Sequence, residues 1–375
     1  MAERMLRPYR WRFPLMALAL LALLAGLWAG LQRLGWGLPR LQPTLPLEHG
    51  PLMVVGFLGT LIGLERAVAL QRLGHLWAYA APLLSGLGAL VLIVGLPAEP
   101  GQLLILLGNA GLVAIFALLL RHQTTLFMVT MTLGALCLLV GSALWLAGWP
   151  LYHLVLWWGG FLVLTIVGER LELSRVRRLT QAARGSFMLA SGLLLAGLVL
   201  TLADLNTGVR LTGVGLLALA LWLLRYDVAL RTVRQAGLTR FIALCLLPGY
   251  VWMGLSGLLM LYFGAITAGP AYDAMLHTLF LGFVFSMIFG HAPIIFPAVL
   301  RLPVPFRPIF YSHLLLLHLG LLLRIGGDLA GWPTGWRWGG LFNVVALLLF
   351  LLNTGLAVRG AKVASLHREM NFPAT

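Results

Sequence analysis

Long apolar segments recur along the whole chain and are separated by short polar or basic stretches. Each segment is long enough to cross the hydrocarbon core of a bilayer at about 1.5 Å per helical residue. The pattern predicts twelve membrane-spanning helices, at Phe13 to Leu31, Leu47 to Leu70, Leu76 to Leu96, Leu103 to Leu120, Thr124 to Ala147, Leu151 to Val167, Ser186 to Leu202, Leu211 to Leu224, Phe241 to Gly264, Asp273 to Leu300, Ile309 to Ile325 and Trp338 to Val358. We therefore expect an all-α, polytopic transmembrane helix bundle.

The basic residues give these helices a direction, because cytoplasmic loops carry the excess of Arg and Lys. If the N-terminus is cytoplasmic, the 26 basic residues all fall on the inside except Arg33, Arg40, Arg210, Arg324 and Arg337. Twelve helices return the chain to its starting side, so we expect both termini in the cytoplasm. No loop is long enough for a soluble domain, and no repeat is obvious, so residues 1–375 are predicted to form a single transmembrane domain.

Composition supports a membrane protein and excludes a nucleic-acid-binding one. The chain is 61% hydrophobic and 10% charged, and its mean hydropathy is +0.96, a balance that a water-soluble domain does not show. A net charge of +15 would suggest nucleic acid in a soluble protein, but here the basic residues are spread between apolar runs. We expect the lipid bilayer as the partner, no nucleic acid, and a multi-pass location in a cell inner membrane.

Histidines at two depths are the candidate chemistry, because ionisable side chains inside a membrane are costly and are functional candidates by default. Near the outer face lie His49, His153 and His277, each at the start of a different predicted helix. Imidazole is a common ligand of haem iron and copper. We predict His49, His277, His291 and His318 as haem-binding residues and His49, His153, His277 and His313 as candidate metal ligands; no residue is predicted to be catalytic.

The spacing of His277 and His291 on one predicted helix suits two cofactors stacked across the membrane. Fourteen residues of continuous α-helix descend about 21 Å and return to within about 40° of the same face. Alternatively, His277 is an interfacial residue and His291 bonds a carbonyl freed by Pro293. His153 has a similar alternative, since it also fits an interfacial aromatic belt. His313 and His318 differ by about 140° around their helix, so at most one faces a given cofactor.

Acidic and basic neighbours at two helix ends form a second set of polar candidates. Glu65 and Arg66 lie in the second predicted helix, and Glu169 and Arg170 follow the sixth. They form either a proton path or ion pairs at the cytoplasmic interface, and the pairs are favoured. We expect Asp273 to cap the tenth helix.

Three segments resemble a known family. The segments Glu48–Leu58 (EHGPLMVVGFL), Arg121-His122 and His277–Phe283 (HTLFLGF), with Met287, look like those of the NnrS family of polytopic haem- and copper-containing membrane proteins. The resemblance implies haem b and copper as cofactors. It also implies a role in nitric oxide metabolism, with a small diatomic such as nitric oxide as a partner.

The helix count is also similar to that of the catalytic subunit of haem-copper oxidases and nitric oxide reductases. In that resemblance His49 and His277 match a low-spin haem pair, and His153 matches a copper ligand. The seventh predicted helix carries no histidine and the tenth lacks a His-x-His pair, so a complete reducing centre is not expected.

Three functions remain open from the sequence. The first is a haem-binding, copper-binding protein of nitrogen-oxide metabolism or respiratory electron transfer, acting as an oxidoreductase on nitric oxide or with a quinone-type donor. The second is a cofactor-free transporter, or a metal- or haem-handling carrier with a histidine-lined path, which the prolines of the tenth helix would suit. The third is a scaffold subunit whose partners hold the chemistry.

Overall fold

The computed structural model describes residues 10–174 and 179–371 and contains twelve helical spans that are long and apolar enough to cross a membrane. Nine spans are uninterrupted: α2 (Phe13–Arg33), α6 (Ala98–His122), α7 (Leu126–Leu146), α8 (Leu151–Leu173), α9 (Gln181–Leu200), α10 (Leu205–Tyr226), α12 (Gly237–Phe263), α15 (Phe310–Leu329) and α16 (Pro333–Asn371). The described residues include no strand. The predicted all-α bundle and its twelve spans are confirmed.

Three spans are assembled from shorter pieces. Span two joins η2 (Leu45–Glu48), α3 (His49–Pro51), the π-helix η3 (Leu52–Gly59) and α4 (Thr60–Gln71); span three joins η4 (Leu76–Tyr79) and α5 (Ala80–Val94); span ten joins α13 (Pro270–His277), the π-helix η6 (Thr278–Phe285) and α14 (Ser286–Leu300). Two short helices, η1 (Arg10–Arg12) and α11 (Ala229–Thr232), lie outside the spans.

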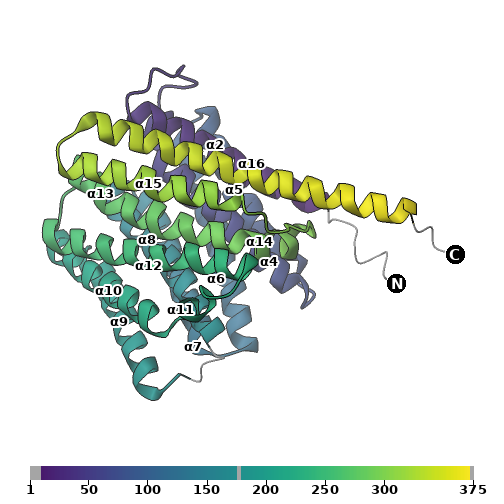
Figure 1. Ribbon diagram of the computed structural model, residues 1–375. Coiled ribbons are helices and arrows are strands. Elements are labelled where there is room, and N and C mark those ends of the chain that lie inside the picture. The colour runs from purple at the N-terminus through teal and green to yellow at the C-terminus, as the bar shows by residue number, and fades with distance from the viewer. Residues whose placement is uncertain (1–9, 175–178, 372–375) are drawn as a thin grey trace.

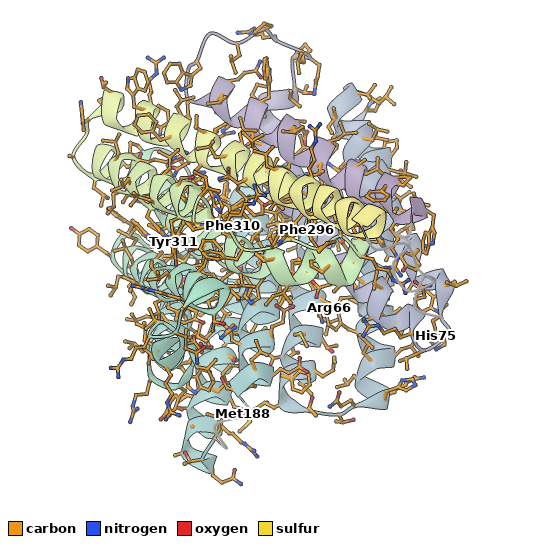
Figure 2. All side chains as sticks on the ribbon, turned by 45° about the vertical axis from the view of Figure 1, so that its right-hand side comes forward. Arg66, His75, Met188, Phe296, Phe310 and Tyr311 are labelled. Carbon is orange, nitrogen blue, oxygen red and sulfur yellow. The ribbon has the colours of Figure 1, made fainter. Side chains whose placement is uncertain are left out.

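Both described ends of the chain lie on one side of the bundle, which we call the inner side, and α16 projects beyond the other helices there (Figure 1). Large apolar side chains point outward along many spans, as Met188 does on α9 (Figure 2). Met188 is 53% exposed and Leu189 beside it is 65% exposed. A soluble protein would bury such residues, so this surface fits contact with lipid.

The first four and the last four spans follow the same plan. In each set the second span carries a histidine near its outer end, followed by an eight-residue π-helix, η3 after His49 and η6 after His277. In each set the first span, α2 or α12, packs against that π-helix. Because each span of the second set comes eight spans after its counterpart in the first, an even number, corresponding spans run in the same direction across the bundle. The sequence shows no obvious repeat, and this correspondence emerges only from the backbone.

Local chemistry accounts for the start of each π-helix. Pro51 precedes η3 and removes one backbone donor from the α-helical ladder. At η6 the hydroxyl of Thr278 instead donates to the carbonyl oxygens of Ala274 and Met275, at 2.8 and 3.0 Å. Both changes disturb the pattern of bonds four residues apart, and π-helical turns of this kind are frequent at functional sites.

The structure extends several predicted helices across polar residues. Span eight begins at Leu205 and not at Leu211, because Asp204 caps it by accepting from the backbone N–H groups of Asn206 and Thr207. The tenth span begins at Pro270 with Gly269 as its cap. The expectation that Asp273 caps this helix is therefore wrong.

Candidate functional site

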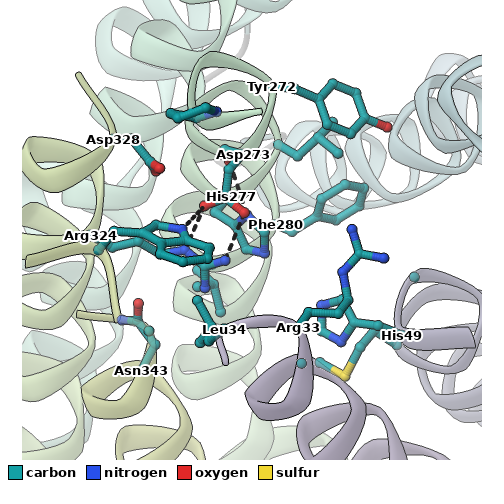
Figure 3. A pocket seen from close by; sticks show the side chains of 18 of the residues that line it. Arg33, Leu34, His49, Tyr272, Asp273, His277, Phe280, Arg324, Asp328 and Asn343 are labelled. Carbon is teal, nitrogen blue, oxygen red and sulfur yellow. Dashed lines mark hydrogen bonds and ion pairs between the residues drawn. The ribbon is translucent and has the colours of Figure 1, made fainter. Parts of the chain in front are cut away.

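The outer ends of six spans enclose a cavity of about 530 Å³. Its wall is mostly apolar, with side chains such as Leu58, Val155 and Phe280. The polar groups gather at its outer end and include His49 and His277 (Figure 3). A mostly apolar cavity of this size with a few convergent polar groups is typical of a site for a cofactor-sized ligand.

His49 is held against the backbone of α2. Its Nδ1 atom lies 2.8 Å from the carbonyl oxygen of Gly26. Gly30 leaves the room for the ring, because a Cβ atom there would lie 2.9 Å from His49 Cε1. A carbonyl oxygen can only accept, so Nδ1 carries the proton and Nε2 of the neutral ring keeps its lone pair.

His277 is fixed in the same way from the opposite wall. Its Nδ1 atom lies 2.9 Å from the carbonyl oxygen of Asp273, one turn earlier, and 3.2 Å from the Oδ1 atom of the same residue. Arg324 donates to both carboxylate oxygens of Asp273, at 2.7 and 2.8 Å, and Trp336 Nε1 donates to Oδ2 at 3.3 Å. Figure 3 shows Asp273 between Arg324 and His277. A carboxylate behind an imidazole is the usual support of a metal-binding histidine.

The two imidazole rings face each other across the cavity. Their centroids are 6.3 Å apart and their planes differ by 23°. A metal between two Nε2 atoms, at about 2.0 Å from each, separates the ring centroids by roughly 6 Å, because each centroid lies about one bond length behind its nitrogen. His49 and His277 would therefore be the two residues that hold a metal ion or a haem iron here, each through its Nε2 atom.

Two arginines and an acid complete the polar end of the cavity. Arg33 and Arg324 both line it, as does Asp328, whose Oδ2 atom is buried without a hydrogen-bond partner among the described residues. Arg33 donates only a long hydrogen bond, of 3.4 Å, to the carbonyl oxygen of Pro46. This end can accept the carboxylates of an anionic ligand.

The other predicted histidines lie elsewhere. His318 uses both ring nitrogens, since Trp252 Nε1 donates to its Nδ1 at 3.0 Å and its Nε2 lies 3.4 Å from Ser286 Oγ. His153 contacts Trp149 and does not line the cavity, although its neighbour in the helix, Val155, does. The structure does not bring either residue to the pair formed by His49 and His277.

His313 and His291 are enclosed by protein. His313 is 1% exposed, lies among Phe241, Phe289 and Phe350, and has its Nδ1 atom 3.1 Å from Asn353 Nδ2. His291 bonds the carbonyl oxygen of Met287 through Nδ1, at 2.7 Å. The Nε2 atoms of both rings are buried and lack a hydrogen-bond partner in the described part of the chain.

The assumption of a continuous α-helix between His277 and His291 is wrong, because η6 occupies eight of the intervening positions. A π-helix has bonds to the fifth residue and therefore turns less per residue than an α-helix. The predicted return of His291 to the face of His277 does not follow, and His291 does not line the cavity. Over the described residues, no three His, Cys, Asp or Glu side chains form a metal-ligand group.

Two residues of the site carried a signal in the sequence that went unused. Arg33 and Arg324 are among the five basic residues that break the positive-inside pattern, and both line the cavity. Arg324 is buried in α15 and paired with Asp273 instead of lying in an outer loop. Exceptions to the charge rule therefore mark this site, while Trp336 and the carbonyl of Gly26 had no signal at all.

Comparison with known proteins identifies a family without a function. The family described as "Domain of unknown function (DUF8744)" matches residues 12–359, which is most of the chain. No curated protein and no solved structure matches the chain.

Proposed function

The chain belongs to the DUF8744 family, and we propose that it is a membrane haem protein in which His49 and His277 are the two axial ligands of one b-type haem. The observation that carries the proposal is the pair of opposed imidazoles with centroids 6.3 Å apart. Both rings have Nδ1 bound to a backbone carbonyl, so both present a basic Nε2 atom to the cavity. We place the protein in a cell inner membrane, as its basic loops indicate.

The surroundings of the two histidines suit a haem in shape and charge. The cavity of about 530 Å³ offers apolar walls for the macrocycle. Arg33, which lines the polar end of the cavity, would hold a propionate there, while Arg324 is already paired with Asp273. A haem bound in this way supplies reversible one-electron chemistry.

The residues of this chain would set the reduction potential of the haem. Asp273 makes the His277 imidazole a stronger donor, which stabilises the oxidised iron, while the guanidinium of Arg324 partly offsets the carboxylate charge. The apolar wall excludes water and raises the cost of net charge in the site. Electron transfer to or from a partner is the activity that two filled axial positions support best.

The connection with nitric oxide is part of the proposal and rests on the resemblance to the NnrS family. Copper rests on the same resemblance; among the described residues no group of three His, Cys, Asp or Glu side chains could hold a metal ion.

The test is a reduced-minus-oxidised spectrum and a pyridine haemochrome assay of the detergent-purified protein. We expect one b-type haem per chain, lost in His49→Ala and in His277→Ala. His153→Ala, which removes another outer histidine but no cavity residue, should keep the haem. A colourless wild-type protein, or colour that survives both cavity substitutions, would overturn the proposal.

A carrier is the second candidate, favoured by the π-helices at matching places in the two four-span sets. Interrupted helices at corresponding positions of a repeat often form the substrate site of a transporter. In this case the cavity would bind haem or a metal ion transiently. Uptake of that cargo by proteoliposomes, abolished in His277→Ala, combined with no haem in the purified protein, would select the carrier over the haem protein.

A further inference from the structure

A second polar region lies near the inner ends of the spans, remote in sequence from the cavity histidines. Arg66 on α4 is hydrogen-bonded to Glu169 on α8 and lies 3.4 Å from the carboxylate of its neighbour Glu65. The three side chains are 12 to 26% exposed before any lipid is considered. Figure 2 shows Arg66 on the inner part of the bundle. One guanidinium is therefore shared by two carboxylates in surroundings that water reaches poorly.

The neighbouring cation cannot compensate the extra negative charge. Arg170 donates two hydrogen bonds of 2.8 Å to Asp227, and these side chains are 4% and 0% exposed. These two nitrogens of the Arg170 fork are therefore used on Asp227 and not on Glu65 or Glu169. Among the described residues, two carboxylates, on Glu65 and Glu169, thus share the one guanidinium of Arg66. A surplus anion in such surroundings favours the uptake of a proton.

His291 offers a second place for that proton. Its Nε2 atom is buried and makes no hydrogen bond within the described residues, and its helix α14 packs against α4, which carries Glu65 and Arg66. The titratable or charged groups of the region are Glu65 and Arg66 on α4, Glu169, Arg170 and Glu172 on α8, Asp227 after α10, Cys245 and Tyr250 on α12, and His291 on α14. Among these, Glu172 is exposed.

An apolar layer separates this region from the cavity. Phe57 on η3 and Phe285 on η6 stack with their centroids 6.1 Å apart and their planes 18° apart. They follow His49 and His277 by the same number of residues, and each precedes the inner charged groups of its own span. Phe285 lines the cavity, so the pair stands between the cavity and the charged groups along these two spans, whereas the exposed Glu172 lies on the inner side.

We propose that Glu65, Glu169 and Arg66 form a proton-binding site, completed by His291, that takes up one proton from the inner side of the membrane. The proton neutralises the carboxylate that Arg66 leaves uncompensated. The site is distinct from the haem proposal and would function in proton uptake whether or not the cavity binds haem. Its residues are not ligands in that proposal.

The test is infrared spectroscopy of the full-length protein in sealed, uniformly oriented vesicles at neutral pH. We expect an infrared band from the C=O stretch of a protonated, buried carboxyl group. The band should shift in heavy water and be lost in at least one of the two variants Glu65→Gln and Glu169→Gln. Glu99→Gln changes an exposed carboxylate at the outer start of α6 and should leave the band intact. Absence of the band in the wild type, or its persistence in both Glu65→Gln and Glu169→Gln, would overturn the proposal.

A second measurement uses only the wild type and therefore does not depend on the folding of a variant. The pH is changed on one side of the vesicle membrane at a time, and the amplitude of the carboxyl band is followed. We expect the amplitude to respond to the inner side. A response to the outer side alone would contradict the proposed direction of uptake.

Discussion

The outer cavity and the inner charged region both contain a histidine whose Nδ1 atom is fixed on a backbone carbonyl, but they differ in what the other nitrogen faces. Nε2 of His49 and of His277 faces a cavity of about 530 Å³. Nε2 of His291 is enclosed by protein on α14, which packs against the helix that carries Glu65 and Arg66. The same side chain with the same support is thus placed to ligate in one region and to hold a proton in the other.

The two regions also differ in how their charges are paired. In the outer region Arg324 and Asp273 form a matched pair behind a ligand. In the inner region Arg66 is shared by two carboxylates, whereas Arg170 donates both of its printed bonds to Asp227. Matched charge orients a neighbouring group, whereas unmatched charge in a low-dielectric place is relieved by moving a proton.

Breaking the matched inner pair should give the largest effect on stability. Arg170→Met leaves Asp227 charged and buried, and we expect a loss of about 3–5 kcal/mol. Thermal unfolding in detergent measures it. The double variant Arg170→Met with Asp227→Asn should recover most of the loss, since Asn still accepts the N–H of Ala229. Wild-type stability of the single variant would show that the pair is not needed.

Removing the charge behind the outer ligand should weaken haem binding about 10–100-fold, the usual range for a group that supports a metal ligand. Asp273→Asn keeps the shape of the residue but loses most of its attraction for Arg324 and His277. Haem titration of the apoprotein measures the change. Asp204→Asn, at an exposed outer turn, is the matched control. Equal affinities of these two variants would exclude a supporting role for Asp273.

Crowding His49 should have a smaller effect, and that effect should be confined to the outer region. A Cβ atom at Gly30 would come within 2.9 Å of the ring, and overpacking of this kind costs about 1 kcal/mol where the neighbour can move. We expect Gly30→Ala to release haem severalfold faster and to leave the inner carboxyl band unchanged. Gly192→Ala adds the same methyl group to α9 in open space. If both substitutions release haem equally, the close contact is irrelevant.

Thinning the layer between the regions should change stability least. Phe57→Leu removes the aromatic pair with Phe285, which is worth about 0.5 kcal/mol beyond its buried area. The more informative effect of Phe57→Leu is on the access of protons to the inner region. The inner carboxyl band should begin to respond to the pH of the outer side. Phe13→Leu alters a partly exposed phenylalanine and is the control. An unchanged sidedness in Phe57→Leu would remove the stacked pair as a barrier.

The sequence predicted much of the fold and half of the site. The twelve spans followed from apolar length, and His49 and His277 followed from their depth at two helix starts. The support behind each ring, from Gly26 and from Arg324 through Asp273, could not be predicted, because it joins residues on different spans. His153 shares the depth of the pair and still lies apart from it, since depth does not fix the position of a helix around the bundle.

Apolar length and the distribution of arginine by themselves predicted twelve membrane-spanning helices and their alternating direction, because lipid imposes both requirements on every residue independently of its neighbours. Only the tertiary structure decided that η3 and η6 are π-helices in matching places, which histidines meet, and which carboxylates share Arg66. Those features depend on rotation about each helix axis and on contacts between spans far apart in the chain, and a one-dimensional pattern contains neither.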